Sequence, residues 1–184
     1  MKTKPVIDLM VPLSEYATVS EEATLSEAVA ALKQSQTDFD QAKYRHRAIL
    51  VLGADGQVVG KVNFQDILRS LEPKYDEMLS DKRPMHTGFT RMYQKAIFDS
   101  MRLWHDPMDQ ICVKAAQIKV KTFMVKPIDN EMIELDASLG EAVHQLVLGH
   151  HQSLLVIDAK QVVGVLRLTD VFEMVSSAIM ACKL

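Results

Sequence analysis

The stretch that decides the fold is QVVGKVNFQDIL, residues 57 to 68, because nearly the same string, QVVGVLRLTDVF, returns at residues 161 to 172. In both copies a Gln-Val-Val-Gly tetrad is followed, six residues after its glycine, by an aspartate. Asp66 follows Gly60 in the first copy, and Asp170 follows Gly164 in the second. A run of this length that recurs with the same spacing indicates that one structural unit is made twice.

The similarity between the copies extends upstream of this string. Residues 23 to 32, ATLSEAVAAL, match ASLGEAVHQL 114 positions later, and Met10-Val11 matches Met124-Val125 at the same offset. The apolar run at 49 to 52 matches the run at 154 to 157 at an offset of only 105, so the first copy carries nine extra residues before this run. Loops absorb such differences more easily than packed elements, and we expect a longer loop there in the first copy.

Both copies predict a helix at the same point. Thr24-x-x-Glu27 and Ser138-x-x-Glu141 have the form of a capping box, in which a hydroxyl accepts from a backbone N–H and a carboxylate accepts from the N–H of the capping residue. A second amphipathic run follows each Val-Val-Gly segment and predicts another helix.

Two strands are predicted between these helices in each copy. The runs 48 to 52 and 153 to 157 are short, apolar and rich in branched residues, and each is followed by a turn and the Val-Val-Gly strand. The order of elements is then β-α-β-β-α, made twice. The sequence therefore predicts an α+β fold built from two such repeats.

Composition limits the classes of protein to which the chain can belong. Its 184 residues are 48% apolar and 24% charged, which suffices for a sizeable core. Two cysteines 70 positions apart indicate no disulfide framework. The first residues contain no apolar leader segment, and no apolar run approaches the ~20 residues that cross a bilayer. A net charge of −3 does not indicate a basic surface for nucleic acid. We expect a cytoplasmic protein that binds neither membrane nor nucleic acid.

The order of elements, the turn before each Val-Val-Gly strand and the Gly-to-Asp ending together resemble the paired cystathionine β-synthase (CBS) domain, or Bateman module. The resemblance covers residues 5 to 71 as repeat 1 and 119 to 181 as repeat 2, with 72 to 118 as a helical insertion. It implies one compact module in which the repeats pack about a pseudo-twofold axis, and clefts between them that bind adenosine nucleotides (AMP, ADP or ATP).

The resemblance also implies roles for individual residues. The aspartate accepts from ribose hydroxyls, a Thr or Ser three positions before it lies near phosphate, and residues before the first and second strands of a repeat hold adenine. This sequence departs from that pattern, because Asn63 and Arg167 stand at the Thr or Ser positions, and Leu50 and Leu155 replace the proline usual in the preceding strand.

By the family's arrangement each cleft combines residues of both repeats. One expected site uses Tyr16, Ala17 and Ala48 with Arg167 and Asp170; the twin site uses Asn130, Glu131 and Ser153 with Asn63 and Asp66. Arg167 suits the first site to a polyphosphate, whereas Glu131 adds negative charge to the second. An alternative stays open for both aspartates: at the third position of a helix, a carboxylate is stabilising by charge and dipole alone, without any ligand.

The insertion contains an apolar stripe at helical spacing. Its members are Phe89, Met92, Tyr93, Ala96, Ile97, Ser100, Met101 and Trp104. We expect this helix to end near Asp106-Pro107, because the residue before a proline avoids the helical region, and a second short helix to span Met108 to Ile118. The stripe is compatible with packing against its own domain and with a dimer or partner contact.

No catalytic or metal-binding constellation is present. His144, His150 and His151 lack a carboxylate or cysteine at ligand spacing, and no nucleophile with a recognisable setting accompanies His105. We therefore expect no enzyme, no catalytic cofactor and no metal. The first hypothesis is a stand-alone regulatory module that binds an adenosine nucleotide and changes its homodimer or partner geometry. The second is an assembly or adaptor protein that acts through the inserted helix.

Overall fold

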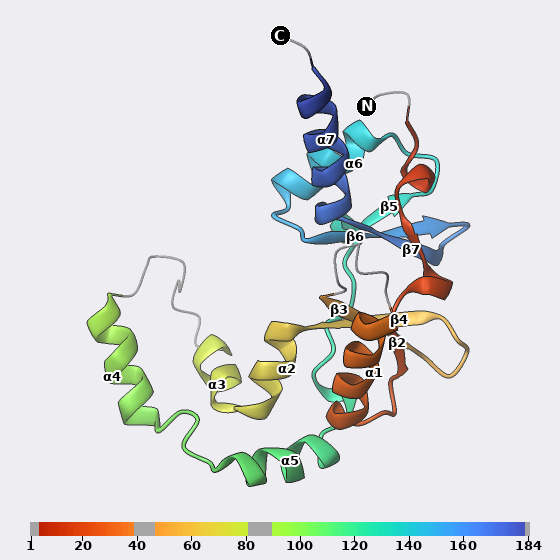
Figure 1. The fold of residues 1–184 in the computed structure, drawn as a ribbon. Helices are drawn as coiled ribbons and strands as arrows, with labels where there is room; N and C mark the ends of the chain where they lie inside the picture. The colour runs from red at the N-terminus through yellow and green to blue at the C-terminus, as the bar shows by residue number, and fades with distance from the viewer. Residues whose placement is uncertain (1–3, 39–46, 81–89, 183–184) are drawn as a thin grey trace.

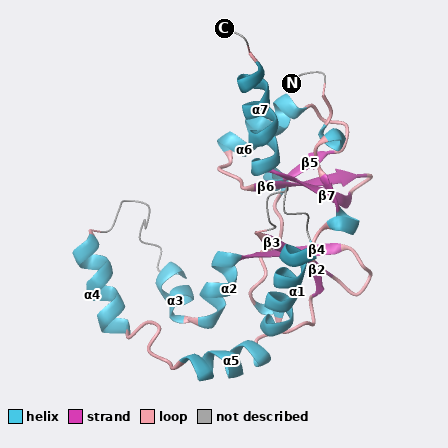
Figure 2. Cartoon of the chain, viewed as in Figure 1, coloured by secondary structure: helices cyan, strands magenta, loops and turns pink. Residues whose placement is uncertain are grey.

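Two β-sheets lie one above the other at the centre of the molecule, with helices on their outer faces (Figure 1). The structure is a computed structural model and describes residues 4–38, 47–80 and 90–182. Figure 2 shows the strands gathered in these two layers and the helices of the insertion extending to one side. The α+β fold with a helical insertion is thus confirmed.

Each half of the molecule has the predicted order of elements. The first half consists of β2 (Thr18–Ser20), α1 (Leu25–Asp38), β3 (Ala48–Leu52), β4 (Val58–Asn63) and α2 (Phe64–Leu71). The second half consists of β5 (Met132–Glu134), α6 (Leu139–Leu148), β6 (Ser153–Asp158), β7 (Gln161–Arg167) and α7 (Leu168–Ala181). In each half the first of these strands runs parallel to the second, and the second pairs antiparallel with the third.

The predicted capping boxes open the first helix of each half. The Thr24 N–H donates to Glu27 Oε2 over 2.6 Å, and the Glu27 N–H donates back to Thr24 Oγ1 over 3.3 Å. In the second half, the Ser138 N–H donates to Glu141 Oε2 over 2.8 Å, and the Glu141 N–H donates to Ser138 Oγ over 3.2 Å. Each pair satisfies backbone donors that a helix start leaves free.

The segment that precedes the first strand of each half, β2 or β5, packs on the opposite half. The short strand β1 (Val11–Pro12) pairs antiparallel with β7, and Val6 is fully buried in the core of the second half. Correspondingly, Val125 pairs with Lys61 on β4, and Val120 is fully buried in the core of the first half. We call residues 4–12 and 118–125 the crossing segments; the repeated Met-Val dipeptide lies within them.

The repeated glycines make room for the crossing segments. A Cβ atom on Gly164 would lie 2.6 Å from the carbonyl oxygen of Val11, and one on Gly60 would lie 2.6 Å from the sulfur of Met124. Both separations are too short for a real side chain. Glycine is therefore required at position 164, where the neighbour is backbone, whereas a side chain at position 60 would force the Met124 side chain to move.

Besides the cores of the two halves, a third apolar cluster joins the two sheets. Its buried members are Val11, Tyr16, Leu50, Leu155 and Val165, which come from both halves. The leucines that replace the family's proline, Leu50 and Leu155, are each 2% exposed. These positions therefore contribute apolar area to the contact between the halves.

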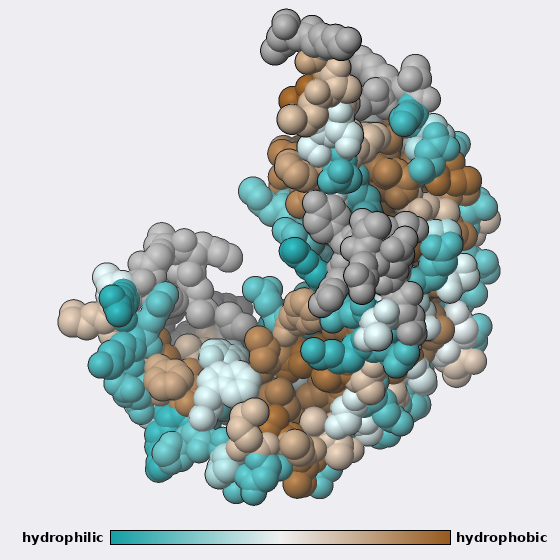
Figure 3. Space-filling view, in the orientation of Figure 1, coloured by the Kyte–Doolittle hydropathy of each residue, from teal (hydrophilic) through white to brown (hydrophobic). Residues whose placement is uncertain are grey.

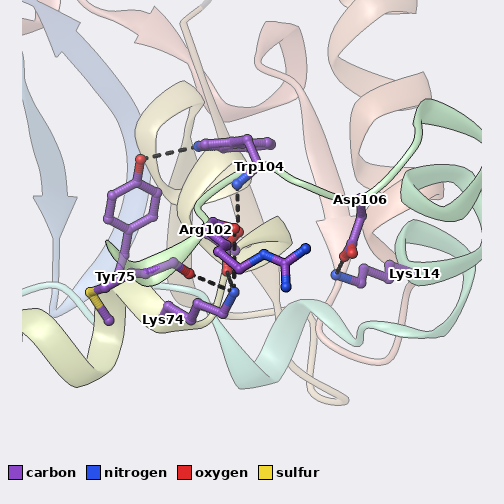
Figure 4. Close-up of polar contacts among 8 residues, drawn as sticks. Lys74, Tyr75, Arg102, Trp104, Asp106 and Lys114 are labelled. Atoms are coloured by element: carbon purple, nitrogen blue, oxygen red, sulfur yellow. Dashed lines mark hydrogen bonds and ion pairs between the residues drawn. The ribbon is translucent and has the colours of Figure 1, made fainter. Parts of the chain in front are cut away.

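The insertion comprises α3 (Lys74–Ser80), α4 (Arg91–Met101) and α5 (Met108–Gln117). The prediction that the first inserted helix extends to about Asp106 is wrong. Arg102 adopts the left-handed conformation (φ 50°) and ends α4. The turn is fixed because the Trp104 N–H donates to Glu72 over 2.9 Å, and its indole N–H donates to the Tyr75 hydroxyl over 3.1 Å (Figure 4). The second helix lies where predicted.

The apolar stripe of α4 is largely uncovered. No residue of α4 is buried, and Met92 is 82% exposed. Ile97 and Phe98 line an apolar groove beside Leu68 of α2 and Trp104. Apolar side chains gather in the hollow between the insertion and the first half (Figure 3). Phe89, also assigned to the stripe, lies outside the described residues.

Candidate functional site

A pocket of about 490 Å³ lies between the two halves. The first half contributes Tyr16, Arg47, Ala48, Lys61, Asn63, Phe64 and Gln65. The second half contributes Glu131, His150, His151, Gln152, Ser153, Arg167 and Thr169. A pocket of this size holds a ligand as large as a typical cofactor or drug.

Positions that are equivalent in the two repeats face each other across this pocket. Ala48 and Ser153 begin β3 and β6, whereas Asn63 and Arg167 end β4 and β7. All four residues line the pocket. The pocket therefore lies on the pseudo-twofold axis, where the two repeats meet.

The charged side chains of the pocket lining are mostly basic. Among the lining residues that the structure describes, Arg47, Lys61 and Arg167 are basic and Glu131 is the one acidic residue. Because a cleft with low-dielectric walls concentrates the field of its charges, this balance favours an anionic ligand, and Asp170 of the adjacent pocket offsets the charge of Arg167.

Lys61 and Glu131 form an ion pair that joins the two halves. Lys61 Nζ lies 2.5 Å from Glu131 Oε1, and the two side chains are only 17% and 13% exposed. Lys61 belongs to β4, and Glu131 belongs to the 3₁₀ turn η4 (Asp129–Glu131) that precedes β5. His151 Nδ1 lies 3.9 Å from the same carboxylate oxygen, so Glu131 lies between two nitrogen-bearing side chains.

Arg167 and Asp170 form a second ion pair at the start of α7. Arg167 Nε and Nη2 each donate to a different oxygen of Asp170 over 2.5 Å. Asp170 lines an adjacent pocket of about 330 Å³, and Arg167 lines both pockets. Burial raises the pKa of the nearby Tyr16 phenol to about 12, whereas the charge of Arg167 acts to lower it and that of Asp170 to raise it. Tyr16 is therefore a neutral phenol at physiological pH.

Asp66 has a helix-capping role. Its carboxylate accepts from the backbone N–H of Asn63 over 2.9 Å, and the Asn63 side chain accepts from the Asp66 N–H over 3.1 Å. Burial raises the pKa of the Asp66 carboxyl, and the hydrogen bond from Asn63 opposes that shift. These contacts match the alternative left open from the sequence, in which the aspartate stabilises a helix start.

Residues predicted for two separate clefts meet in part in one pocket. Six of the ten line it: Tyr16, Ala48, Asn63, Glu131, Ser153 and Arg167. The other four lie elsewhere: Asp66 in its capping box, Asp170 in the adjacent pocket, Ala17 in the core of the first half, and Asn130 on the surface. The carbonyl oxygen of Asn130 accepts from the Gln145 amide over 2.8 Å.

Several lining residues were missed by the sequence interpretation, notably Lys61, Thr169 and Gln152. The repeat offsets alone would not have identified them, because the equivalents of Thr169 and Gln152 were not predicted either. Thr169 is equivalent to Gln65, and Gln152 is equivalent to Arg47; both members of each pair line the pocket. Lys61 directly follows the motif glycine but has valine as its counterpart.

Within residues 4–38, 47–80 and 90–182, no group of three or more His, Cys, Asp or Glu side chains is arranged to hold a metal ion. In the same part of the chain, every helix is too short or too polar to span a bilayer.

A model of the CBS domain family matches residues 6–73 and 120–177. A search of curated proteins finds no match. Among solved structures, a CBS domain of a membrane protein from Sphaerobacter thermophilus is 17% identical, with a TM-score of 0.61 over 94% of this chain and 88% of that chain.

Two similar structures are described with a nucleotide. CBSX2, a protein of Arabidopsis thaliana, in complex with AMP is 15% identical, with a TM-score of 0.58 over 95% of this chain and 98% of that chain. The CBS domain of a bacterial CNNM/CorC family Mg²⁺ transporter in complex with ATP is 15% identical, with a TM-score of 0.59 over 95% and 89%. At these identities the likeness concerns the fold.

Proposed function

The chain belongs to the CBS domain family, and on this premise we propose that it is a regulatory module, not an enzyme, that binds an adenosine nucleotide between its two halves. The observation that carries the proposal is the pocket on the pseudo-twofold axis, whose described lining contains three basic residues and one acidic residue. The nucleotide complexes of CBSX2 and of the transporter domain support the choice of ligand class.

The lining offers groups suited to each part of a nucleotide. Phe64, which is 44% exposed, presents an aromatic surface for adenine stacking. Arg167 and Arg47 carry the positive charge that phosphate requires. Ser153 and Thr169 supply hydroxyls that both donate and accept. Asp170 lines the adjacent pocket, where its carboxylate accepts from Arg167. The ribose role that the resemblance implies for Asp170 therefore requires a ligand that extends from one pocket into the other.

A ligand in this pocket would act on the relative position of the two halves, because it contacts both. Binding shifts a conformational equilibrium only through a difference in affinity between two arrangements. We propose that the arrangement of the halves is read out by a second copy of the chain or by a partner protein, in the cytoplasm.

The second candidate function is an adaptor that acts without a ligand. The observation that favours it is α4, which has no buried residue and exposes Met92 to 82%. Exposed apolar residues gathered on one helix are typical of a surface that binds protein. In this alternative the repeats are a scaffold for the inserted helix.

Isothermal titration with AMP, ADP and ATP distinguishes the two functions. Ala48→Leu fills part of the pocket, whereas Ala54→Leu makes the same change at an exposed turn position. We expect the wild type and Ala54→Leu to bind, and Ala48→Leu to bind at least tenfold more weakly. A wild type that gives no heat with all three nucleotides contradicts the proposal and favours the adaptor. Steady consumption of nucleotide would indicate an enzyme.

A further inference from the structure

The Lys61–Glu131 ion pair lies in the wall of the pocket itself. Both residues line it, and both side chains are less than one-fifth exposed. The ion pairs Arg69–Asp76 and Lys121–Glu22 are instead much more exposed, at 51% and 61%, and at 46% and 63%. Water and salt screen such exposed pairs strongly, whereas the charges of a largely buried pair are screened much less.

The Glu131 carboxylate lies beside Lys61, whose positive charge a phosphate in this pocket would need. Its carboxylate holds Lys61 at 2.5 Å and also accepts from the backbone N–H of Ile128 over 3.4 Å. It is the one acidic side chain among the described lining residues. An anion that approaches Lys61 therefore meets a carboxylate already bound there.

We propose that Glu131 is a specificity-determining residue that competes with the phosphates of the ligand for Lys61. This inference rests on the proposed function, because it concerns the phosphate end of the same nucleotide. Each further phosphate adds negative charge beside Glu131, so the carboxylate disfavours a polyphosphate tail more than a monophosphate. Glu131 thereby limits the selectivity of the pocket for ATP over AMP.

The proposal predicts that the affinity for nucleotide increases when the negative charge of Glu131 is removed. Glu131→Gln keeps an oxygen that accepts from Lys61 but removes the negative charge. We expect it to bind ATP roughly tenfold more tightly than the wild type, and AMP with a smaller gain. A residue that merely shapes the pocket would cause a loss instead.

The experiment is isothermal titration of wild type, Glu131→Gln and the control Glu134→Gln, with ATP, AMP and inorganic tripolyphosphate. Glu134 is an exposed residue of β5, three positions along the chain. The control should match the wild type with every probe. Glu131→Ala, which is equally neutral, serves as a second variant if Glu131→Gln is unstable, and should show the same gain.

The three probes separate the failure of this inference from the failure of the proposed function. Nucleotide binding that stays equal or weakens in both neutral variants overturns the inference and leaves the proposed function standing. A tighter tripolyphosphate complex in Glu131→Gln, with no binding of ATP or AMP by any variant, supports competition for Lys61 and overturns adenosine recognition. No binding of any probe overturns both.

Discussion

From the packing of the crossing segments we expect a residue near the N-terminus, Val6, to stabilise the second half of the molecule. Val6 and Val120 occupy equivalent positions, are both fully buried, and belong to the cores of the second and the first half respectively. Val6→Ala and Val120→Ala should therefore destabilise the protein as core substitutions do. Val113→Ala is the matched control, because Val113 lies on α5 and is 59% exposed.

The magnitude follows from the atoms removed. Each substitution deletes two methyl groups, and burial of one such group is worth about 0.8 kcal/mol, so the transfer contribution is about 1.6 kcal/mol. The cavity left in a close-packed core adds to this cost, which brings the total to about 2 to 3 kcal/mol. For a protein of this size the melting temperature should fall by roughly 4 to 10 °C, whereas the exposed control should change stability by less than about 0.5 kcal/mol.

Thermal and urea unfolding followed by far-UV circular dichroism measure these differences. Dichroism is preferable to fluorescence because the single tryptophan, Trp104, lies in the insertion and not in either half. If Val6→Ala unfolds at the same temperature and urea concentration as Val113→Ala, the N-terminal segment is not part of the core of the second half. The account of how the halves are joined would then be refuted.

Two further predictions concern pH. The hydrogen bonds from Thr24 and Ser138 lower the pKa of Glu27 and Glu141. The stability that these carboxylates add is therefore present above the unfolded pKa of about 4.5 and is lost as pH falls through the lower folded pKa. The urea midpoints of Glu27→Gln and Glu141→Gln should vary less between pH 5 and 3 than that of the wild type. Burial raises the pKa of Tyr16 to about 12, so Tyr16 favours the folded state below pH 10 and loses that contribution as pH rises through 12. Absorbance at 295 nm should show one tyrosine that ionises late, and Tyr16→Phe should abolish that phase.

Local patterns were sufficient to predict the elements of the two halves. The capping boxes at Thr24 and Ser138 fixed two helix starts, because their hydrogen bonds span three residues and can be inferred from spacing alone. The same reasoning failed at the end of α4. There the chain turns at Arg102, and the turn is fixed by the Trp104 N–H that donates to Glu72, 32 positions earlier, a contact that no local rule contains.

The crossing segments lay beyond the reach of such patterns. The repeated Met-Val dipeptide indicated that residues 10 and 124 have equivalent roles, but not which half each one packs against. β1 is only two residues long, so periodicity cannot identify it. Its partner strand β7 is more than 150 residues away and was selected by tertiary packing, including the space above Gly164.

Six of the ten residues assigned to the two expected clefts line the candidate pocket, but the sequence did not predict that they share one pocket. The resemblance assigned Ala48 and Ser153 to different clefts, and Asn63 and Arg167 likewise. In the structure these residues lie close enough to the axis to share a single pocket. The Lys61–Glu131 pair spans 70 positions in the chain, and a charge pair at such a separation obeys no spacing rule.

A symmetric pair of repeats poses a problem for recognition of a nucleotide, which has an aromatic end and an anionic end. If equivalent positions were identical, a pocket on the axis would present every group twice and could not distinguish the two orientations of the ligand. The chain differs between the repeats at these positions: Lys61 corresponds to Val165, Glu131 to Ala17, and Arg167 to Asn63. The duplicated backbone builds the pocket, and these substitutions give its two sides the different chemistry that an asymmetric ligand requires.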